Sequence, residues 1–500
     1  MMYKTKFIQE ICLEETSKSL SSKDIFMEKN NSLVKQIRDF GIGPIVGMLI
    51  GTLTVPITTR LVSPEEFGKS SLFTLLQTIF NLVILLGFDQ SYVRFYNQKE
   101  INKRKLLYNC LIFPVILCFF LVLILIVFRK SILFFMFGQY DTLIAVSLVF
   151  FLPALMFNRF AMLTIRMELR GKLYSFLNIF QQIITFFSLL IFLFFYERTF
   201  KSIVLSTVVA TILTSIVSIL CSKQFFSFKD YVFDKILIKE LVKFGLPLLP
   251  AGILTWVMNS FDKIGLRTWS SFEELGLYSA AFKIVALLTV IQNIFSTSWT
   301  PLAYKWYEEK VPNKKFEEVG TIIISLMSIM FSVIIVFRYV IMFFLGPEYR
   351  NTANIFVFLL FNPALYTTLE VTGQGLGFKK KSIYSLISSA IAASINFIGN
   401  FLLIPKYGAI GAAISTCISY LIFFFTKTLI SRRIWFKFSI KKYIINIVLL
   451  LFFGINMMTL QNRIIEYSLF FIVCIYNAYN LFNVYKDRKK QSVSVSQEQN

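Results

Sequence analysis

The stretch LYNCLIFPVILCFFLVLILIVF, residues 107–128, carries no charged side chain and is long enough to cross a membrane as one helix. A spanning helix needs roughly 20 apolar residues. Similar stretches recur along the chain, and 56% of its 500 residues are hydrophobic while 16% are charged. That composition supplies about fourteen spans at roughly 20 apolar residues each. We therefore predict an all-α polytopic membrane protein with about 14 transmembrane helices.

Two short motifs occur twice and in the same order. Asp39-Phe40-Gly41-Ile42 is matched by Lys243-Phe244-Gly245-Leu246, and Ser63-Pro64-Glu65-Glu66-Phe67-Gly68 by Ser271-Phe272-Glu273-Glu274-Leu275-Gly276. The motifs at Asp39 and Lys243 each open a predicted span, and these two spans run in the same direction across the membrane. The pattern predicts two parallel six-helix lobes around a central cavity, followed by two C-terminal helices. Chance similarity of short motifs is the alternative explanation.

The predicted organisation follows from these spans and from the polar segments between them. A compact polar lead-in starting at Met27 suggests that translation begins there rather than at Met1. The predicted parts are an N-terminal cytoplasmic tail (1–39), an N-lobe of six spans (40–221), a basic cytoplasmic linker (222–243), a C-lobe of six spans (244–430), the last two spans (431–485) and a C-terminal cytoplasmic tail (486–500).

The charge distribution predicts the orientation. Of the 51 Lys and Arg residues, 37 fall on the side of the two termini, 11 on the other side and 3 within spans. Cytoplasmic loops collect Lys and Arg, so both termini are expected to be cytoplasmic. The same rule explains the net charge of +23 without any nucleic-acid partner, and we expect the basic loops to meet anionic lipids.

The composition also excludes several kinds of chemistry. The chain has no histidine, which removes His-based acid–base catalysis, Ser-His-Asp sites and His-ligated metals. Its six cysteines are scattered and form no C-x-x-C pair, so helix packing is their expected role. No phosphate-binding G-x-x-x-x-G-K-[ST] motif and no long extramembrane loop is present. We expect no enzyme, no cofactor and no metal.

Four segments carry a family resemblance. The chain resembles the Wzx-type oligosaccharide flippases, the polysaccharide-export branch of the superfamily that also contains the MATE drug exporters and the lipid II flippase. The segments are Leu61-Val62-Ser63-Pro64-Glu65-Glu66-Phe67-Gly68, Gly87-Phe88-Asp89-Gln90-Ser91-Tyr92-Val93-Arg94-Phe95, Asp262-Lys263 with Glu274-Leu275-Gly276-Leu277-Tyr278-Ser279-Ala280-Ala281-Phe282-Lys283, and Gly377-Phe378-Lys379-Lys380-Lys381 with Asn396, Asn400 and Ile404-Pro405-Lys406-Tyr407-Gly408-Ala409-Ile410-Gly411-Ala412-Ala413.

The resemblance implies a function. Such a protein flips polyprenyl-diphosphate-linked oligosaccharide repeat units from the inner to the outer leaflet of the bacterial plasma membrane by alternating access. The product serves surface polysaccharide assembly of the O-antigen or capsule type, and transient contact with a polysaccharide polymerase is implied. A MATE-like drug/cation antiporter is the alternative, and it would have acidic residues dominating its cavity and twelve helices.

Four basic residues are candidates for binding the diphosphate. A charge inside the bilayer costs at least about 2.5–3.5 kcal/mol at mid-membrane, so each needs a cavity or a partner. Lys283, Arg159 and Lys263 lie within predicted spans, and Arg60 ends the first span. They would line the cavity as cations; snorkelling to the interface is the alternative for Lys283 and Arg159, and a surface role for Arg60.

Three acidic residues are candidates for ion coupling or charge pairing. Asp89 lies near the end of the second span, Asp262 within the seventh and Glu370 in the tenth. Each could bind H⁺ or Na⁺ during transport, or could neutralise a nearby cation. Asp262 and Lys263 are adjacent and point about 100° apart, so at most one of them faces the cavity.

Four prolines are candidates for gating. Pro44 and Pro56 belong to the first span, and Pro247 and Pro250 to the start of the seventh, its counterpart in the repeat. Proline removes a backbone donor and kinks a helix, so these helices are expected to bend between inward- and outward-facing states. Passive packing is the alternative.

Overall fold

The computed structural model describes residues 22–96, 98, 101–226 and 233–498, and within these ranges the chain is helical with no strand. Helix α2 begins at Ser22, within the predicted tail 1–39, and runs unbroken into the first span. Residues 1–21, where a start at Met1 would matter, lie outside the described ranges.

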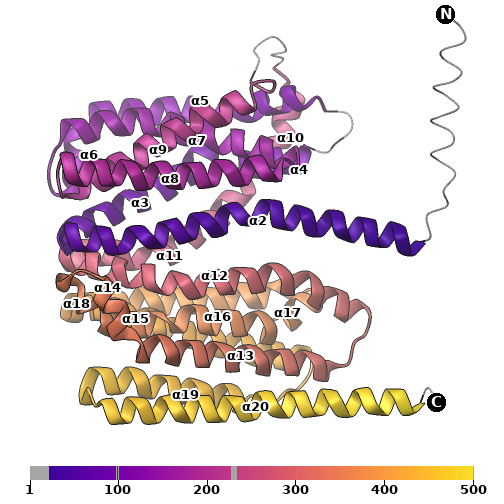
Figure 1. Ribbon diagram of the computed structural model, residues 1–500. Coiled ribbons are helices and arrows are strands. Elements are labelled where there is room, and N and C mark those ends of the chain that lie inside the picture. The colour runs from indigo at the N-terminus through magenta and orange to yellow at the C-terminus, as the bar shows by residue number, and fades with distance from the viewer. Residues whose placement is uncertain (1–21, 97, 99–100, 227–232, 499–500) are drawn as a thin grey trace, which may run out of the picture.

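The first half of the chain forms one helical bundle (Figure 1). We call it the first bundle. Its helices are α2 (Ser22–Leu61), α3 (Pro64–Leu85), α4 (Phe88–Phe95), α5 (Lys103–Val127), α6 (Arg129–Phe137), α7 (Thr142–Met167), α8 (Gly171–Phe195) and α9 (Phe200–Cys221).

The second half forms a similar bundle, reached through α10 (Lys235–Gly245) and the short η2 (Leu246–Leu248). The second bundle comprises α11 (Leu249–Trp269), α12 (Phe272–Glu308), α13 (Asn313–Val336), α14 (Arg338–Phe344), η3 (Pro347–Tyr349), α15 (Thr352–Leu359), α16 (Phe361–Thr372), α17 (Gly375–Phe378) and α18 (Ser382–Ile434). The chain closes with α19 (Lys441–Ile455), the π-helix η4 (Asn456–Leu460) and α20 (Arg463–Glu498), which lie together on the outside of the second bundle (Figure 1).

The helices run nearly parallel to one axis, and both described chain ends lie at the same end of the molecule (Figure 1). We call this the terminal end. The opposite end, where α2 and α11 finish and α3 and α12 begin, is called the distal end.

Within the described residues, eleven helices are long and apolar enough to cross a membrane, or twelve if the bent helix α12 counts as one span. One of the eleven covers the 52 residues Ile383–Ile434. A straight helix of that length would measure about 78 Å, against a hydrocarbon core of about 30 Å. The backbone of Gly408 leaves the helical region there, with φ 53° and ψ −131°, and divides α18 into two helices. The sequence count of fourteen stays a prediction.

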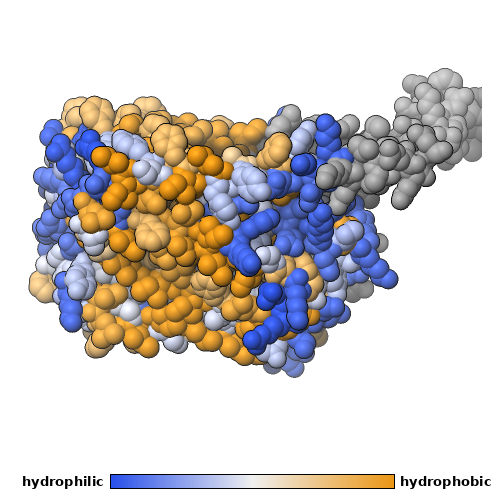
Figure 2. All heavy atoms as spheres, turned by 90° about the horizontal axis from the view of Figure 1, so that it is seen from below, coloured by the Kyte–Doolittle hydropathy of each residue, from blue (hydrophilic) through white to orange (hydrophobic). Residues whose placement is uncertain are grey.

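The surface has the polarity expected in a lipid bilayer. Figure 2 shows a broad apolar band across the middle of the molecule, with hydrophilic residues at both ends. Large side chains such as Phe195 (86% exposed) and Phe135 (78% exposed) point outward, while many Ser, Thr and Asn side chains are buried between the helices. All-helical backbone satisfies its own hydrogen bonds where no water is present.

A break between α3 and α4 sets the direction of α4. Leu86 (φ 47°) and Gly87 (φ 78°) both adopt the left-handed conformation. A Cβ on Gly87 would lie 2.3 Å from the carbonyl oxygen of Gly245, at the end of α10. In addition, Ser91 Oγ donates a hydrogen bond of 2.9 Å to the carbonyl oxygen of Leu241. The linker helix α10 is therefore seated directly on α4 of the first bundle.

The other end of α10 is also fixed to the first bundle. Lys105 Nζ lies 2.6 Å from Asp234 Oδ2, and this ion pair holds the pKa of the Asp234 carboxyl below its ordinary value. The backbone N–H of Asp234 donates to Asn109 Oδ1 (3.0 Å). The last part of the linker predicted at 222–243 thus lies in α10, which extends to Gly245. The chain leaves the first bundle at η2.

We predict that Gly87→Ala lowers the melting temperature of the purified protein by several degrees. The alanine Cβ meets both a left-handed backbone, which costs about 1–2 kcal/mol, and the Gly245 carbonyl. Gly41→Ala is the matched control, because a Cβ there meets nothing within 4 Å. Thermal unfolding of both variants in the same detergent measures the difference, and equal melting temperatures would contradict the assigned contact.

Candidate translocation site

The two bundles cross at the distal end through a pair of glycines that belong to the repeated motif. A Cβ on Gly276 would lie 1.8 Å from the carbonyl oxygen of Pro64, and a Cβ on Gly68 would lie 2.0 Å from that of Phe272. Each glycine therefore rests on the backbone four residues before its counterpart. The contact is reciprocal, so it relates α3 and α12 by an approximate twofold axis.

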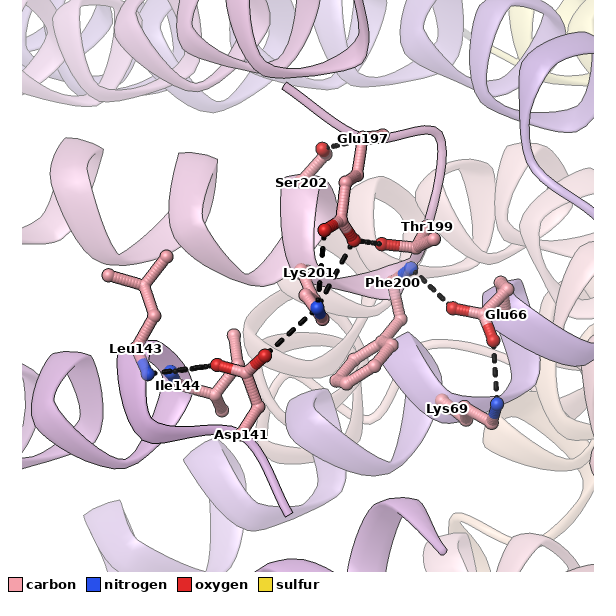
Figure 3. Close-up of polar contacts among 10 residues, drawn as sticks. All are labelled: Glu66, Lys69, Asp141, Leu143, Ile144, Glu197, Thr199, Phe200, Lys201 and Ser202. Carbon is pink, nitrogen blue, oxygen red and sulfur yellow. Dashed lines mark hydrogen bonds and ion pairs between the residues drawn. The ribbon is translucent and has the colours of Figure 1, made fainter. Parts of the chain in front are cut away.

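The glutamates of the same motif also have equivalent roles. Glu66 Oε2 accepts a hydrogen bond of 2.9 Å from the N–H of Phe200, at the start of α9 (Figure 3). Glu274 Oε2 accepts one of 2.7 Å from the N–H of Ala409, directly after the break in α18. A carboxylate at a helix N-terminus satisfies free N–H groups and interacts favourably with the helix dipole. Each motif glutamate thus links the distal end of its own helix, α3 or α12, to the last helix of the same bundle. We call the distal helix ends of a bundle its rim.

Charges reinforce the rim of the first bundle (Figure 3). Lys69 Nζ lies 2.6 Å from Glu66 Oε1, and Lys201 Nζ lies 2.9 Å from Asp141 Oδ2 and 3.2 Å from Glu197 Oε2. The Lys201 pairs join the ends of α7 and α9, and Glu66, which is paired with Lys69, links α3 to α9.

Further contacts join the bundles at the distal end. Gly346 donates its N–H to Thr59 Oγ1 (3.3 Å), and Tyr349 OH donates to the Val62 carbonyl (2.9 Å). Arg60 Nη2 donates to the Phe343 carbonyl (2.9 Å). The structure therefore places Arg60 in the distal contact between α2 and α14.

A cation–π arrangement completes the distal contact. The Phe272 ring lies between the Lys69 ammonium of the first bundle, 5.5 Å from the ring centroid, and the Arg267 guanidinium, 4.3 Å from it. Arg267 Nη2 also donates to the Phe135 carbonyl of the first bundle (3.3 Å). Sequence reasoning missed Lys69 and Arg267 as contact residues because both were counted only as loop charges.

The predicted cations Lys263 and Lys283 lie on the neighbouring helices α11 and α12 in the distal half of the second bundle. Lys263 is partly buried, and its Nζ lies 5.8 Å from the ring centroid of Phe282, the residue before Lys283. The Lys283 side chain is exposed and shares a stripe of α12 with Ala286 and Ile294. Two like charges within membrane depth are costly unless water or an anion reaches them.

Asp262 is buried in the second bundle. It is 6% exposed and accepts three hydrogen bonds, from Tyr278 OH (2.6 Å), Thr416 Oγ1 (2.7 Å) and Asn400 Nδ2 (2.5 Å). The adjacent residues Asp262 and Lys263 therefore face different surroundings, as the 100° helical step requires. The hydrogen-bond donors to Asp262 are neutral groups of α12 and α18, whereas the sequence analysis considered ion coupling or a nearby cation for this residue.

Glu370 lies deeper toward the terminal end. Ser296 Oγ donates to Glu370 Oε2 (2.5 Å), and the carboxylate interacts electrostatically with Lys427 of α18. Lys427 is half-buried and its Nζ lies 5.4 Å from the centroid of Phe423. The sequence analysis counted Lys427 among the cytoplasmic loop charges, whereas in the structure it belongs to helix α18.

Asp89 and Arg159 form an ion pair inside the first bundle. Arg159 Nη2 of α7 lies 2.8 Å from Asp89 Oδ2 of α4. The Asp89 side chain is 9% exposed, whereas that of Arg159 is 42% exposed. The sequence singled out both residues without pairing them, because the break at Leu86 and Gly87 that turns α4 toward α7 leaves no clear sequence signal.

The four predicted gating prolines occupy two different settings. Pro44 and Pro56 lie inside the continuous helix α2. Pro247 lies in η2 and Pro250 is the second residue of α11, so both belong to the short connection that leaves the first bundle. Their role in gating stays a proposal.

We predict that Gly276→Ala separates the bundles at the distal end, since its Cβ cannot fit 1.8 Å from the Pro64 carbonyl. Spin labels on cysteines placed at Glu65 and Glu273, in a cysteine-free background, should report a longer distance in this variant. Gly51→Ala on α2 is the control, because a Cβ there meets nothing within 4 Å. Unchanged distances in Gly276→Ala would show that the crossing does not close the distal end.

Solved structures with a similar fold are membrane transporters. The lipid II flippase MurJ in an inward closed conformation superposes with a TM-score of 0.68 at 14% identity, over 89% of this chain and 98% of that one. A multidrug resistance MATE family transporter in an inward-facing conformation gives a TM-score of 0.55 at 16% identity, over 80% and 94%. A Vibrio cholerae MATE transporter gives 0.53 at 15% identity, over 81% and 97%. These likenesses establish the fold.

Sequence comparison identifies the family. An uncharacterized membrane protein of Methanocaldococcus jannaschii is 25% identical over 257 residues, and the match spans half of each chain. The family model described as "Polysaccharide biosynthesis protein" matches residues 39–306, which is more than half of the chain. The Wzx-type assignment stays a proposal, and the chain belongs to the polysaccharide biosynthesis protein family.

Proposed function

We propose that this protein moves polyprenyl-diphosphate-linked oligosaccharide repeat units from the cytoplasmic to the outer leaflet of the bacterial plasma membrane, for surface polysaccharide assembly. The observation that carries the proposal is the set of cations at membrane depth, Lys263, Lys283 and Arg159, in a chain of the polysaccharide biosynthesis family. An anionic lipid head group is the ligand that such side chains suit.

The proposed orientation follows from the distribution of charge. With the terminal end in the cytoplasm, the distal crossing of Gly68 and Gly276 closes the outer side. The described conformation is then the one that loads substrate from the cytoplasm. Export would require α3 and α12 to separate at the distal end, with the bundles rocking about the connection at Pro247 and Pro250.

Lys263 and Lys283 give the proposal an energetic basis. Like charges on neighbouring helices repel each other, and a diphosphate bound between these two lysines would relieve that repulsion. A carrier also removes the cost of taking sugar hydroxyls through hydrocarbon, which is several kcal/mol for each unsatisfied group.

The membrane potential supplies a driving force for the proposed direction. The membrane potential is negative inside, so moving one negative charge outward is favourable by about 2.3 kcal/mol per 100 mV. Coupling to H⁺ or Na⁺ is the other energy source that we propose to test, with Asp262 and Glu370 as the carboxylates that would bind the ion. Contact with anionic lipids, and transient contact with a polysaccharide polymerase that receives the product, are part of the same proposal.

We predict that Lys283→Gln and Lys263→Gln each reduce export of lipid-linked repeat units by about tenfold, the factor expected when one charged hydrogen bond to a diphosphate is lost. Export is measured as the lipid-linked oligosaccharide trapped in a deletion strain complemented with each variant. Lys406→Gln is the control, since Lys406 is an exposed lysine at the distal end.

The deletion strain tests the function itself. Under the proposal it accumulates diphosphate-linked repeat units inside the cell and loses surface polysaccharide. Normal surface polysaccharide together with new sensitivity to cationic drugs would replace the proposal with the MATE-like antiporter.

A further inference from the structure

Arg159 faces the interior of the protein at membrane depth. The exposed apolar residues of α7, Leu143, Val146 and Phe150, mark its lipid-facing side. Arg159 follows Phe150 by nine residues, which at about 100° per residue places it half a turn away from that side. Its side chain is nevertheless 42% exposed. The guanidinium therefore reaches a water-accessible space that lies inside the first bundle or between the bundles.

Asp89 is held in position by contacts other than its ion pair. Phe88 and Tyr92 of α4 are buried in the core of the first bundle, and Tyr92 OH lies 2.9 Å from Thr164 Oγ1 of α7. Gly87 and Ser91 fix the same helix on α10. The Asp89 carboxylate is thus presented to Arg159 by a rigid element, and the helix does not depend on Arg159 for its placement.

The ion pair engages only part of the guanidinium. Arg159 Nη2 contacts Asp89 Oδ2 at 2.8 Å, and the same oxygen accepts from Gln90 Nε2 at 3.0 Å. Arginine binds phosphate oxygens through two parallel hydrogen bonds, and Asp89 takes one N–H of Nη2 here. A phosphate that binds the fork containing this N–H must displace the carboxylate, and a phosphate at the other fork is repelled by the neighbouring negative charge. A phosphate and Asp89 therefore compete for Arg159.

We propose that Asp89 is a positioning residue that holds Arg159 in the empty carrier and is displaced by the diphosphate of the substrate. The proposal rests on the function proposed above. Displacement leaves the nearly buried carboxylate without its cation, which is unfavourable. That cost weakens substrate binding and draws Arg159 back to Asp89, so the pair promotes release of the phosphate after translocation.

The test compares affinity with turnover in Asp89→Asn. The amide keeps the shape and one acceptor oxygen but removes the competing charge. We expect farnesyl diphosphate to bind the purified full-length variant about tenfold more tightly than wild type by calorimetry, while export in cells becomes slower. Inorganic pyrophosphate should show the same ratio, and the neutral alcohol farnesol should show no change.

Two further variants separate this role from a structural one. Asp89→Glu restores a carboxylate and should return both affinity and export toward wild type. Asp487→Asn, which removes an acid paired with Lys314 at the terminal end, should leave both unchanged. A purely structural role for Asp89 predicts weaker binding and a lower melting temperature in Asp89→Asn.

The outcomes distinguish the two proposals. If wild type binds farnesyl diphosphate and Asp89→Asn binds it equally or less tightly, the positioning role is wrong and the flippase function stands. If folded wild type binds neither farnesyl diphosphate nor pyrophosphate, the proposed function fails and this role fails with it. If the tightening is confined to pyrophosphate, Arg159 serves a free phosphate and the lipid-linked substrate is excluded from this site.

Discussion

The reciprocal glycine contact between α3 and α12 is the constraint on which the described conformation depends. Gly68 and Gly276 bring two backbones together without a side chain between them, each against a carbonyl oxygen of the other helix. This approach places the distal ends of the bundles in contact, and the hydrogen bonds of Thr59 and Val62 and the ring of Phe272 all act across the same junction. Any residue with a Cβ at either position would hold the bundles apart.

The same motif also links helices within each bundle. Glu66 and Glu274 occupy equivalent places, and each satisfies the N-terminus of the last helix in its own bundle. The glutamates therefore contribute contacts within each bundle, and the glycines allow the close backbone approach between the bundles. One six-residue motif, used twice, takes part in both sets of contacts.

The charged side chains inside the bundles have different kinds of surroundings. Asp262 is surrounded by hydroxyl and amide donors and so is satisfied without a cation. Lys263, its neighbour in sequence, lies over the ring of Phe282 instead. In the first bundle, Arg159 is balanced by Asp89. Among the described residues, Lys263 and Lys283 form no ion pair, and an anionic ligand suits such side chains.

The sequence by itself determined the membrane-embedded helical fold, the repeated motif and the identity of the intramembrane charges, because apolar length and charge cost in a bilayer are properties of the local chain. It did not reveal the pairing of Asp89 with Arg159, the donors around Asp262, or the roles of Lys69, Arg267 and Lys427. These depend on helix breaks such as Leu86-Gly87 and on which faces meet, and packing between helices that are distant in sequence decides both.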